Sequence, residues 1–299
     1  MPSPCVRTFH HRDFSAAALA RLKAGRTVTV CLPARDEEAT VGRIVGVLRR
    51  ELVDHVALVD EILVIDDGSV DGTAATARAA GSRVIDANAV LADHGPSRGK
   101  GDAMWRGLFE ADGDLVVFCD ADVRNFGPRF VVGLLGPLLT DDTIGFVKGF
   151  YERPLDGRAG EGGRVTELVA RPLLSLLFPA LTTVVQPLAG ECAARREVLE
   201  AVPFVDGYGV EMGLLVDVAR RFGIDALAQV DLGNRVHRNR ALPDLAEQSM
   251  AILQTALDRA GIERGAEWSS ILVRPTGDAV EVAFSERPPL ADIGARRTA

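Results

Sequence analysis

Two aspartates, Asp120 and Asp122, end the stretch DLVVFCDAD at residues 114–122. The apolar residues before them have the composition of a buried strand, and such a strand has no packing use for two carboxylates. Residues two apart in a strand point to the same side, so the sequence predicts that both carboxylates face one site. Mg²⁺ and Mn²⁺ prefer oxygen ligands of this kind, with substrate phosphates completing the shell. The alternative is a turn whose aspartates cap the following loop.

Two further acidic clusters lie at the ends of predicted strands. LPARDEEAT, which contains Glu37, begins at the end of the β-branched stretch 27–33, and VIDDGSVDGT, which contains Asp67, begins within the stretch 61–69. Short acidic side chains suit ribose hydroxyls and the imide N–H groups of a base, so both clusters are candidate nucleotide contacts. The alternative is that they only cap the helices that follow, a role for which Ser69 and Asp71 are well placed.

Lys100 lies in the glycine-rich stretch RGKG. The spacing is not that of a P-loop, because Gly101 and Asp102 follow the lysine where a P-loop has serine or threonine. A lysine in a glycine-rich loop still suits a phosphate or a sugar hydroxyl. The alternative is a solvated lysine at the surface.

Strand-like and helix-like segments alternate through the first half of the chain. Strands are predicted at 27–33, 61–69, 83–85 and 114–122, and helices between them at 36–53, at 71–81 and within 95–111. This alternation predicts an α/β fold with a mostly parallel sheet flanked by helices. Ligands bind beyond the carboxyl ends of the strands in such sheets, and all three acidic clusters lie there.

The pattern after residue 140 is less regular. Strands are predicted within 144–154 and 224–240, helices within 162–178, 207–223 and 243–261, and a turn with a helix within 186–202. A helix ending at Gly25 is predicted near the start, and the tail 285–299 is expected to be loosely ordered. No repeat or low-complexity linker interrupts the chain, which favours one continuous domain with a C-terminal extension.

The composition argues against several classes of protein. A formal net charge of −8 does not favour a nucleic-acid-binding surface. The four cysteines, at positions 5, 31, 119 and 192, form no C-x-x-C pair, which favours a reduced, cytoplasmic protein without disulfides. The start MPSPCVRTFHHRDF is too polar for a signal peptide, and no apolar run of about 18 residues predicts a membrane span, so no membrane partner is expected.

These motifs together resemble those of the GT-A glycosyltransferases, which use nucleotide-sugar donors. Longer stretches are similar to the glucosyl-3-phosphoglycerate synthase family and its mannosyl-3-phosphoglycerate relatives, namely GKGDAMWRGL, DLVVFCDAD, FVKGFYERPL, GGRVTELVARPLL, QPLAGECA, GYGVEMGLL and NRVHRNR. The resemblance covers roughly residues 26 to 245. It implies a Rossmann-like GT-A fold with an N-terminal extension (1–25), a nucleotide-sugar-binding part (26–140), an acceptor-binding part (141–245) and a C-terminal helical extension and tail (246–299).

The resemblance implies a role for each residue that matches a family motif. Donor binding falls to Pro33, Ala34, Arg35, Glu37, Asp67, Lys100, Asp120, Ala121, Tyr208, Glu211 and Arg235. Acceptor binding falls to Gly163, Arg164, Thr166 and Asn239, metal binding to Asp120, Asp122 and His237, and catalysis to Lys100, Asp122 and Glu211. Two positions depart from the family pattern, which often has serine in place of Ala121 and a less charged residue in place of Arg35.

The residues by themselves leave other roles open. Arg164 follows two glycines and suits a phosphate or carboxylate, but an ordinary salt bridge with Glu167 is the alternative. His237 lies among arginines beyond a predicted strand, which favours phosphate chemistry over a hydrogen-bonded core histidine. Glu211 is alternatively a carboxylate that only stabilises a helix N-terminus.

The implied reaction moves glucose from UDP-glucose to the 2-hydroxyl of 3-phosphoglycerate, with retention of the anomeric configuration. The resemblance further implies Mg²⁺ or Mn²⁺ as the cofactor and a homodimer as the assembly. The alternatives are a mannosyl-3-phosphoglycerate synthase that uses a GDP-sugar, an inverting transferase that glycosylates a polyprenyl phosphate with Glu211 as its base, and a sugar-nucleotide sensor without turnover.

Overall fold

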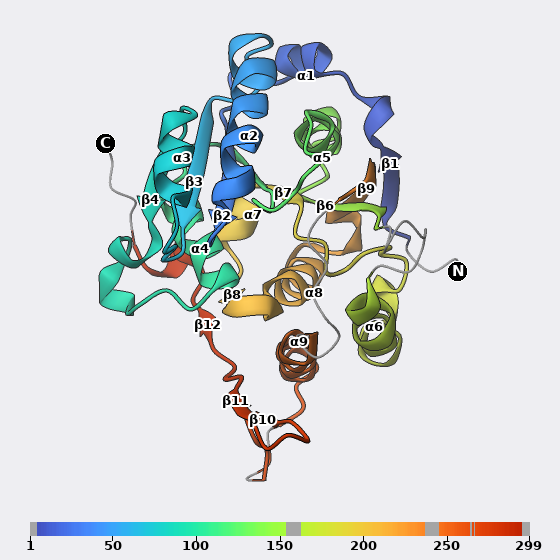
Figure 1. The fold of residues 1–299 in the computed structure, drawn as a ribbon. Coiled ribbons are helices and arrows are strands. Elements are labelled where there is room, and N and C mark those ends of the chain that lie inside the picture. Colours follow the sequence, from blue (N-terminus) through green and yellow to red (C-terminus); the bar gives the residue numbers. More distant parts are fainter. Residues whose placement is uncertain (1–4, 154–162, 237–244, 264, 266, 295–299) are drawn as a thin grey trace.

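An eight-stranded sheet forms the centre of the molecule, and helices cover both of its faces (Figure 1). The computed structural model describes residues 5–153, 163–236, 245–263, 265 and 267–294. The strand order is β1-β9-β6-β7-β5-β2-β3-β4; β7 is antiparallel to both neighbours and the other pairs are parallel. The bounds are β1 Arg7–His10, β2 Val28–Ala34, β3 Glu61–Asp66, β4 Arg83–Asp86, β5 Leu115–Phe118, β6 Phe146–Glu152, β7 Cys192–Arg195 and β9 Leu227–Asn234. The predicted mostly parallel α/β sheet is confirmed.

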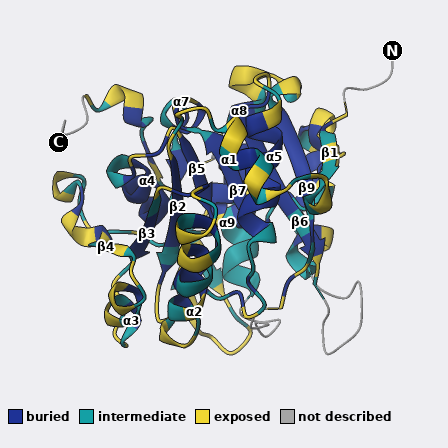
Figure 2. Cartoon of the chain, turned by 90° about the horizontal axis from the view of Figure 1, so that it is seen from above, coloured by how far each residue is buried: buried dark blue, intermediate teal, exposed yellow. Residues whose placement is uncertain are grey.

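The helices form two layers, one on each face of the sheet. One layer contains α1 (Ala16–Leu22), α2 (Glu38–Leu48), α3 (Thr73–Ala79) and α5 (Arg129–Thr140), and the other contains α4 (Lys100–Glu110), α6 (Arg171–Leu177), α7 (Arg196–Glu200) and α8 (Val210–Phe222). Helix α9 (Leu245–Arg259) packs on the outer side of α8. Figure 2 shows the buried strands between these layers and the exposed outer surfaces of the helices. Within the described residues, none of the helices combines the length and the apolar character needed to cross a bilayer.

Alternating side chains of the central strands build two separate cores. In β5, Leu115 and Val117 pack toward the α2 and α5 layer, while Val116 and Phe118 pack toward the α4 and α8 layer. All four side chains are at most 1% exposed. Because both faces of the strand are covered, its sequence is a continuous apolar run and does not alternate with polar residues.

Two small strand pairs lie outside the main sheet. β8 (Phe204–Val205) pairs with β12 (Glu286–Arg287), and β10 (Ile271–Val273) pairs with β11 (Ala279–Glu281). Figure 1 shows the β10–β11 hairpin projecting beyond α9, whereas β12 lies beside β8 and α4. The chain therefore returns to the main body after the hairpin.

Several segments differ from the sequence-based expectation. Residues 7–10 form the edge strand β1 beside β9, although only a helix was expected in the first 25 residues. β7 occupies part of the stretch 186–202, where a turn and a helix were expected; its sequence CAAR has little β propensity, so pairing with β5 and β6 decides its conformation. The tail was expected to be loosely ordered, but it supplies β12 and the buried Arg287.

The start of α4 touches the backbone that leads into α8, and Gly101 makes this contact possible. A Cβ at Gly101 would lie 1.8 Å from the carbonyl oxygen of Val205. We expect Gly101→Ala to lower the free energy of unfolding by about 3 kcal/mol or more, because backbone atoms must move apart. Urea unfolding followed by circular dichroism measures this change.

The control for this prediction is Gly46→Ala in α2, where the added Cβ has no atom within 4 Å. Because alanine has a higher helix propensity than glycine, this substitution should raise the free energy of unfolding by about 0.5–1 kcal/mol. Equal stability of the two variants would contradict the close contact at Gly101.

Candidate active site

The acidic pair lies just beyond β5, at the edge of the sheet where the parallel strands β2 and β3 also end. β5 ends at Phe118, so Asp120 and Asp122 stand in the turn that follows. The expectation that strand geometry aligns the two carboxylates is therefore wrong. A guanidinium aligns them, since Arg235 Nη2 lies 2.7 Å from Asp120 Oδ2 and 2.7 Å from Asp122 Oδ1.

Arg235, which follows β9, holds this cluster from its buried side. The side chain is 5% exposed, and its Nε lies 3.3 Å from Oε1 of the fully buried Glu191. Arg235 Nη1 donates to the Tyr151 hydroxyl at 3.2 Å, and this hydroxyl donates to Glu191 Oε2 at 2.5 Å. One guanidinium thus joins a buried carboxylate behind the site to two more accessible carboxylates in front of it.

Lys100 joins the acidic turn to α8. Its Nζ lies 2.5 Å from Asp120 Oδ1 and 2.8 Å from Glu211 Oε1. Burial disfavours the ammonium, but these carboxylates outweigh it and hold the pKa of Lys100 well above its ordinary value. Burial also disfavours the Asp120 carboxylate, but Lys100 and Arg235 outweigh it and hold the pKa of Asp120 below its ordinary value. Both groups are therefore charged at neutral pH.

The turn before β7 leaves room for the Lys100–Asp120 ion pair. A Cβ at Gly190 would lie 2.5 Å from both Lys100 Nζ and Asp120 Oδ1. The ammonium of the buried Lys148 donates to the carbonyl of Ala189 in the same turn. The backbone of this turn therefore forms one wall of the site.

Glu191 and Tyr151 were not among the residues predicted from the sequence. Both stand inside motifs quoted for the family resemblance, QPLAGECA and FVKGFYERPL. A carboxylate among small apolar residues was the available signal for Glu191, because charged residues are rarely buried unless they are paired. Tyr151 offered no such signal, since an aromatic residue in a strand is ordinary.

The predicted nucleotide contacts lie at the ends of β2 and β3. The Asp67 N–H donates to the Ala34 carbonyl at 2.9 Å, and Ser97 Oγ donates to Asp67 Oδ1 at 2.5 Å. Burial raises the pKa of Asp67. Thr40 Oγ1 donates to the Ala121 carbonyl at 2.6 Å, which ties α2 to the acidic turn. The remaining donor candidates are Pro33 in β2, Arg35 and Glu37 before α2, and the partly exposed Tyr208 before α8.

Part of the second acidic cluster serves the local structure. Asp71 accepts the backbone N–H of Thr73 at 3.0 Å and that of Glu38 at 3.2 Å. Ser69 Oγ accepts the backbone N–H of Asp36 at 3.0 Å. The Asp71 bonds satisfy the first backbone donors of α2 and α3, so the capping interpretation is confirmed for Asp71. Ser69 instead bonds to a backbone donor in the loop that precedes α2.

A polar cavity of about 430 Å³ lies at the end of β6. Its lining includes Tyr151, Arg153, Gly163, Thr166 and Arg171. The Tyr151 hydroxyl also contacts Arg235, so the cavity adjoins the ionic cluster. The two guanidiniums and the hydroxyls of Tyr151 and Thr166 can bind phosphate or carboxylate groups, and the lining also contains the carboxylates of Glu152, Glu167 and Asp231.

Arg164 lies apart from the other acceptor candidates. It lines a second, mostly apolar cavity of about 460 Å³ together with Leu168 and Leu253. The structure therefore brings Gly163 and Thr166 to one cavity and Arg164 to another. Glu167, the alternative salt-bridge partner, forms an ion pair with Arg171 at 3.0 Å.

The acidic pair offers the donor atoms that a divalent metal ion requires. Asp120 and Asp122 converge on a single cationic nitrogen, and their side chains are 21% and 29% exposed. One or two carboxylates with substrate phosphates are a common Mg²⁺ site, so the pair fits such an ion. No group of three His, Cys, Asp or Glu side chains able to hold a metal ion occurs in the described part of the chain. The predicted third ligand His237 and the acceptor candidate Asn239 lie outside the described residues.

Residues 29–202 match the family described as Glycosyl transferase family 2. The glucosyl-3-phosphoglycerate synthase of Mycolicibacterium paratuberculosis is 47% identical, over 97% of this chain and 92% of its own length. A crystal structure of glucosyl-3-phosphoglycerate synthase from Mycobacterium tuberculosis with Mn²⁺, UDP-glucose and phosphoglyceric acid matches with a TM-score of 0.87 and 45% identity, covering 97% of this chain and 99% of that chain. A second structure of that enzyme, with Mg²⁺ and UDP, gives the same values. The mannosyl-3-phosphoglycerate synthase of Rubrobacter xylanophilus matches with a TM-score of 0.88 and 39% identity, covering 96% of this chain and 97% of that chain.

Glu191→Ala tests how far the site depends on its buried carboxylate. We expect the free energy of unfolding to fall by about 3 kcal/mol or more, because the Arg235 guanidinium and the Tyr151 hydroxyl lose a buried partner. Glu167→Ala, which removes the exposed partner of Arg171, should cost less than about 1 kcal/mol. Urea unfolding of both variants measures the difference, and two equally small losses would contradict the structural role of Glu191.

Proposed function

The chain belongs to glycosyl transferase family 2, among the glucosyl-3-phosphoglycerate synthases, and on this basis we propose that it transfers glucose from UDP-glucose to the 2-hydroxyl of 3-phosphoglycerate. The products are glucosyl-3-phosphoglycerate and UDP, with the anomeric configuration retained. The observation that carries this proposal is the ionic cluster at the carboxyl ends of the strands, formed by Lys100, Asp120, Asp122, Glu211 and Arg235.

On the donor side, the proposed roles follow the charges of the cluster. Asp120 and Asp122, with His237, would hold Mg²⁺ or Mn²⁺, and the bound ion neutralises the diphosphate of the donor. Arg235 and Lys100 add positive charge on two sides of the acidic turn. In the proposal, Pro33, Ala34, Arg35, Glu37 and Asp67 line the uridine pocket, Ala121 contacts the donor, and Tyr208 and Glu211 shape the sugar pocket.

On the acceptor side, we propose that Gly163, Arg164, Thr166 and Asn239 bind 3-phosphoglycerate. The polar cavity beside β6 supports this for Gly163 and Thr166, and it adds Arg153 and Arg171 as candidates. The division of the domain into a donor part (26–140) and an acceptor part (141–245) is proposed on the same grounds.

The reaction is proposed to run by front-face attack. The acceptor oxygen bonds to the anomeric carbon while the bond from that carbon to the diphosphate breaks, and the leaving diphosphate takes the hydroxyl proton. Glu211 is ion-paired with Lys100 at 2.8 Å, which supports an orienting role and not that of a covalent nucleophile. The residues contribute orientation and charge stabilisation.

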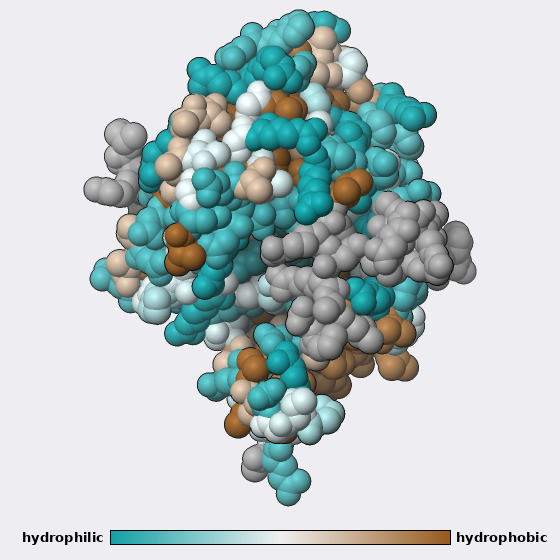
Figure 3. Space-filling model, viewed as in Figure 1, coloured by the Kyte–Doolittle hydropathy of each residue, from teal (hydrophilic) through white to brown (hydrophobic). Residues whose placement is uncertain are grey.

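We also propose a cytoplasmic homodimer. Its support is the exposure of large apolar side chains, with Leu168 72% and Leu176 78% exposed and Ile271 and Val273 of the hairpin also exposed. Figure 3 shows hydrophobic atoms gathered where α6 and α9 lie. The free thiols of all four cysteines favour a reducing compartment. Sedimentation of the purified chain as a monomer at micromolar concentration would contradict the dimer.

The donor and the acceptor are tested together by a panel of nucleotide sugars and acceptors with and without EDTA. UDP-glucose with 3-phosphoglycerate should give UDP release that EDTA abolishes, and proton NMR should show the α-anomer in the product. Turnover only with a GDP-sugar would favour the mannosyl alternative, which the similarity to the Rubrobacter xylanophilus enzyme keeps open. Binding of UDP-glucose without turnover of any acceptor would contradict an enzyme.

Asp122→Ala should lower kcat/KM by about 10²-fold or more, because it removes one proposed ligand of the metal ion. A coupled UDP-release assay measures this, and calorimetry should show weaker Mn²⁺-dependent binding of UDP. The matched control is Asp112→Ala, which removes an exposed carboxylate before β5. Unchanged turnover of Asp122→Ala would contradict the proposal that Asp122 is a ligand of the metal ion.

Thr166→Val should raise the KM for 3-phosphoglycerate about tenfold and leave the KM for UDP-glucose within about twofold, because only a hydroxyl in the acceptor cavity is lost. Steady-state kinetics with each substrate varied in turn measure both constants. A rise confined to the KM for UDP-glucose would contradict the proposed role of Thr166 in binding the acceptor.

A further inference from the structure

The segment 285–293, called here the C-terminal segment, packs against both walls of the proposed donor site. Its strand β12 pairs with β8, and the Ser285 carbonyl accepts the backbone N–H of Asp206 at 2.9 Å. Trp105 of α4 donates its indole N–H to the Pro288 carbonyl at 2.8 Å. A stretch near the end of the chain therefore contacts both α4 and the segment that leads into α8.

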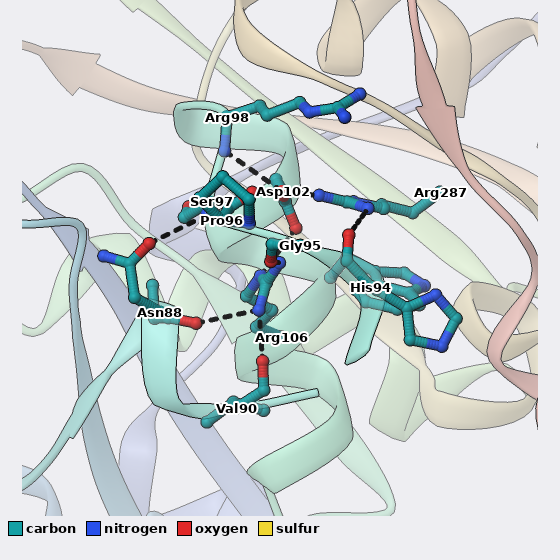
Figure 4. Close-up of polar contacts among 12 residues, drawn as sticks. Asn88, Val90, His94, Gly95, Pro96, Ser97, Arg98, Asp102, Arg106 and Arg287 are labelled. Atoms are coloured by element: carbon teal, nitrogen blue, oxygen red, sulfur yellow. Dashed lines mark hydrogen bonds and ion pairs between the residues drawn. The ribbon is translucent and has the colours of Figure 1, made fainter. Parts of the chain in front are cut away.

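A fully buried carboxylate lies at the centre of these contacts. Asp102, two residues after Lys100, is 0% exposed and accepts from Arg106 Nε at 2.8 Å and from the Arg98 backbone N–H at 3.0 Å. Arg287 of the C-terminal segment forms an ion pair with Asp102 Oδ2, the oxygen that also accepts from Arg98, while Arg106 binds Oδ1. Figure 4 shows Arg106 and Arg287 approaching Asp102 from different directions. Every oxygen of this carboxylate thus has a donor, as a buried charge requires.

The same two guanidiniums hold the loop that precedes Lys100. Arg287 donates to the His94 carbonyl at 2.5 Å and to the Pro96 carbonyl at 3.1 Å, and Arg106 donates to the Gly95 carbonyl between them at 2.7 Å. Three consecutive carbonyls of residues 94–99, called here the donor loop, are therefore fixed by side chains from outside the loop (Figure 4). A guanidinium carries five N–H donors in a rigid plane, so it can bond to several acceptors in different directions at once. A lysine ammonium is a single compact charge with three donors and does not offer this geometry.

The donor loop leads directly to groups of the proposed donor site. Ser97 Oγ donates to Asp67 at 2.5 Å, and Lys100 follows the loop at the start of α4. A Cβ at Gly99 would lie 3.4 Å from Cα of Gly207, so the loop also touches the segment that leads to Glu211. The positions of Asp67, Lys100 and Glu211 thus depend on where this loop lies.

We propose that Arg287 is a positioning residue for the donor site, acting through Asp102 and the donor-loop carbonyls on Lys100 and Ser97. The inference rests on the proposed function, because it assumes that this site binds UDP-glucose. Arg287 itself is 6% exposed and contacts no residue of the acceptor cavity among those named above. Its loss should therefore weaken donor binding and leave acceptor binding nearly unchanged.

The test compares Arg287→Ala and Arg287→Lys with the wild-type full chain. Calorimetry with UDP and Mn²⁺ should show a dissociation constant raised about tenfold in Arg287→Ala and less in Arg287→Lys, which keeps the charge but not the fork. The KM for UDP-glucose should rise in parallel, while the KM for 3-phosphoglycerate stays within about twofold. Hydrogen exchange at the amides of Ser97 and Arg98 should become faster. The matched control is Arg274→Ala, which removes the ion pair between Arg274 of the β10–β11 hairpin and Glu247 of α9 and should change none of these values.

The binding and kinetic measurements on the Arg287 variants decide whether this residue positions the donor site. A folded Arg287→Ala that binds UDP as the wild type does would overturn the inference and leave the proposed function intact. A rise in both KM values by the same factor would also overturn it, because that is the effect of a general loss of structure. If Arg287→Ala does not fold, the UDP dissociation constant and both KM values of Arg287→Lys are compared with those of the wild type. A wild-type chain that does not bind UDP would contradict the proposed function and this inference together.

Discussion

The balance of charge beyond β5 is the constraint on which the rest of the site depends. Arg235 has three carboxylate neighbours, among them Glu191 and Asp120, and Lys100 lies between Asp120 and Glu211. Each member is at least partly buried, so an unpaired one would be strongly destabilising. Because the partners come from the residues that flank β5, β7 and β9 and from the first turns of α4 and α8, the packing of all five elements has to deliver these groups to one point.

Close backbone contacts make that convergence possible. Gly190 lets the turn before β7 reach the Lys100–Asp120 pair, and Gly101 lets α4 touch Val205. A side chain at either position would occupy space that the ion pair or the neighbouring carbonyl already fills. The site therefore combines charged groups, which need partners, with glycines, which allow those partners to approach.

Buried ionic networks recur on the other side of α4, where Asp102 and two arginines join the C-terminal segment to the donor loop. The two networks share one helix: Lys100 in its first turn belongs to the first, and Asp102 belongs to the second. A site built on the end of a helix is held more firmly when that end is fixed from both directions. The C-terminal segment 285–293 therefore packs closely against α4 and β8.

The sequence by itself determined the sheet class and the place of the acidic clusters, because apolar runs mark buried strands and the ends of parallel strands meet at one edge. It also indicated the family, through the resemblance of long motifs such as QPLAGECA and FVKGFYERPL. It did not determine that β5 stops before Asp120, that CAAR forms β7, or that Arg235 aligns Asp120 and Asp122 from 115 and 113 residues away. Nor did it reveal the contact between Asp102 and Arg287, 185 residues apart. Periodicity reports only which way a residue faces within its own element, whereas the partner of a buried charge is chosen by which distant elements the folded chain brings within hydrogen-bonding distance.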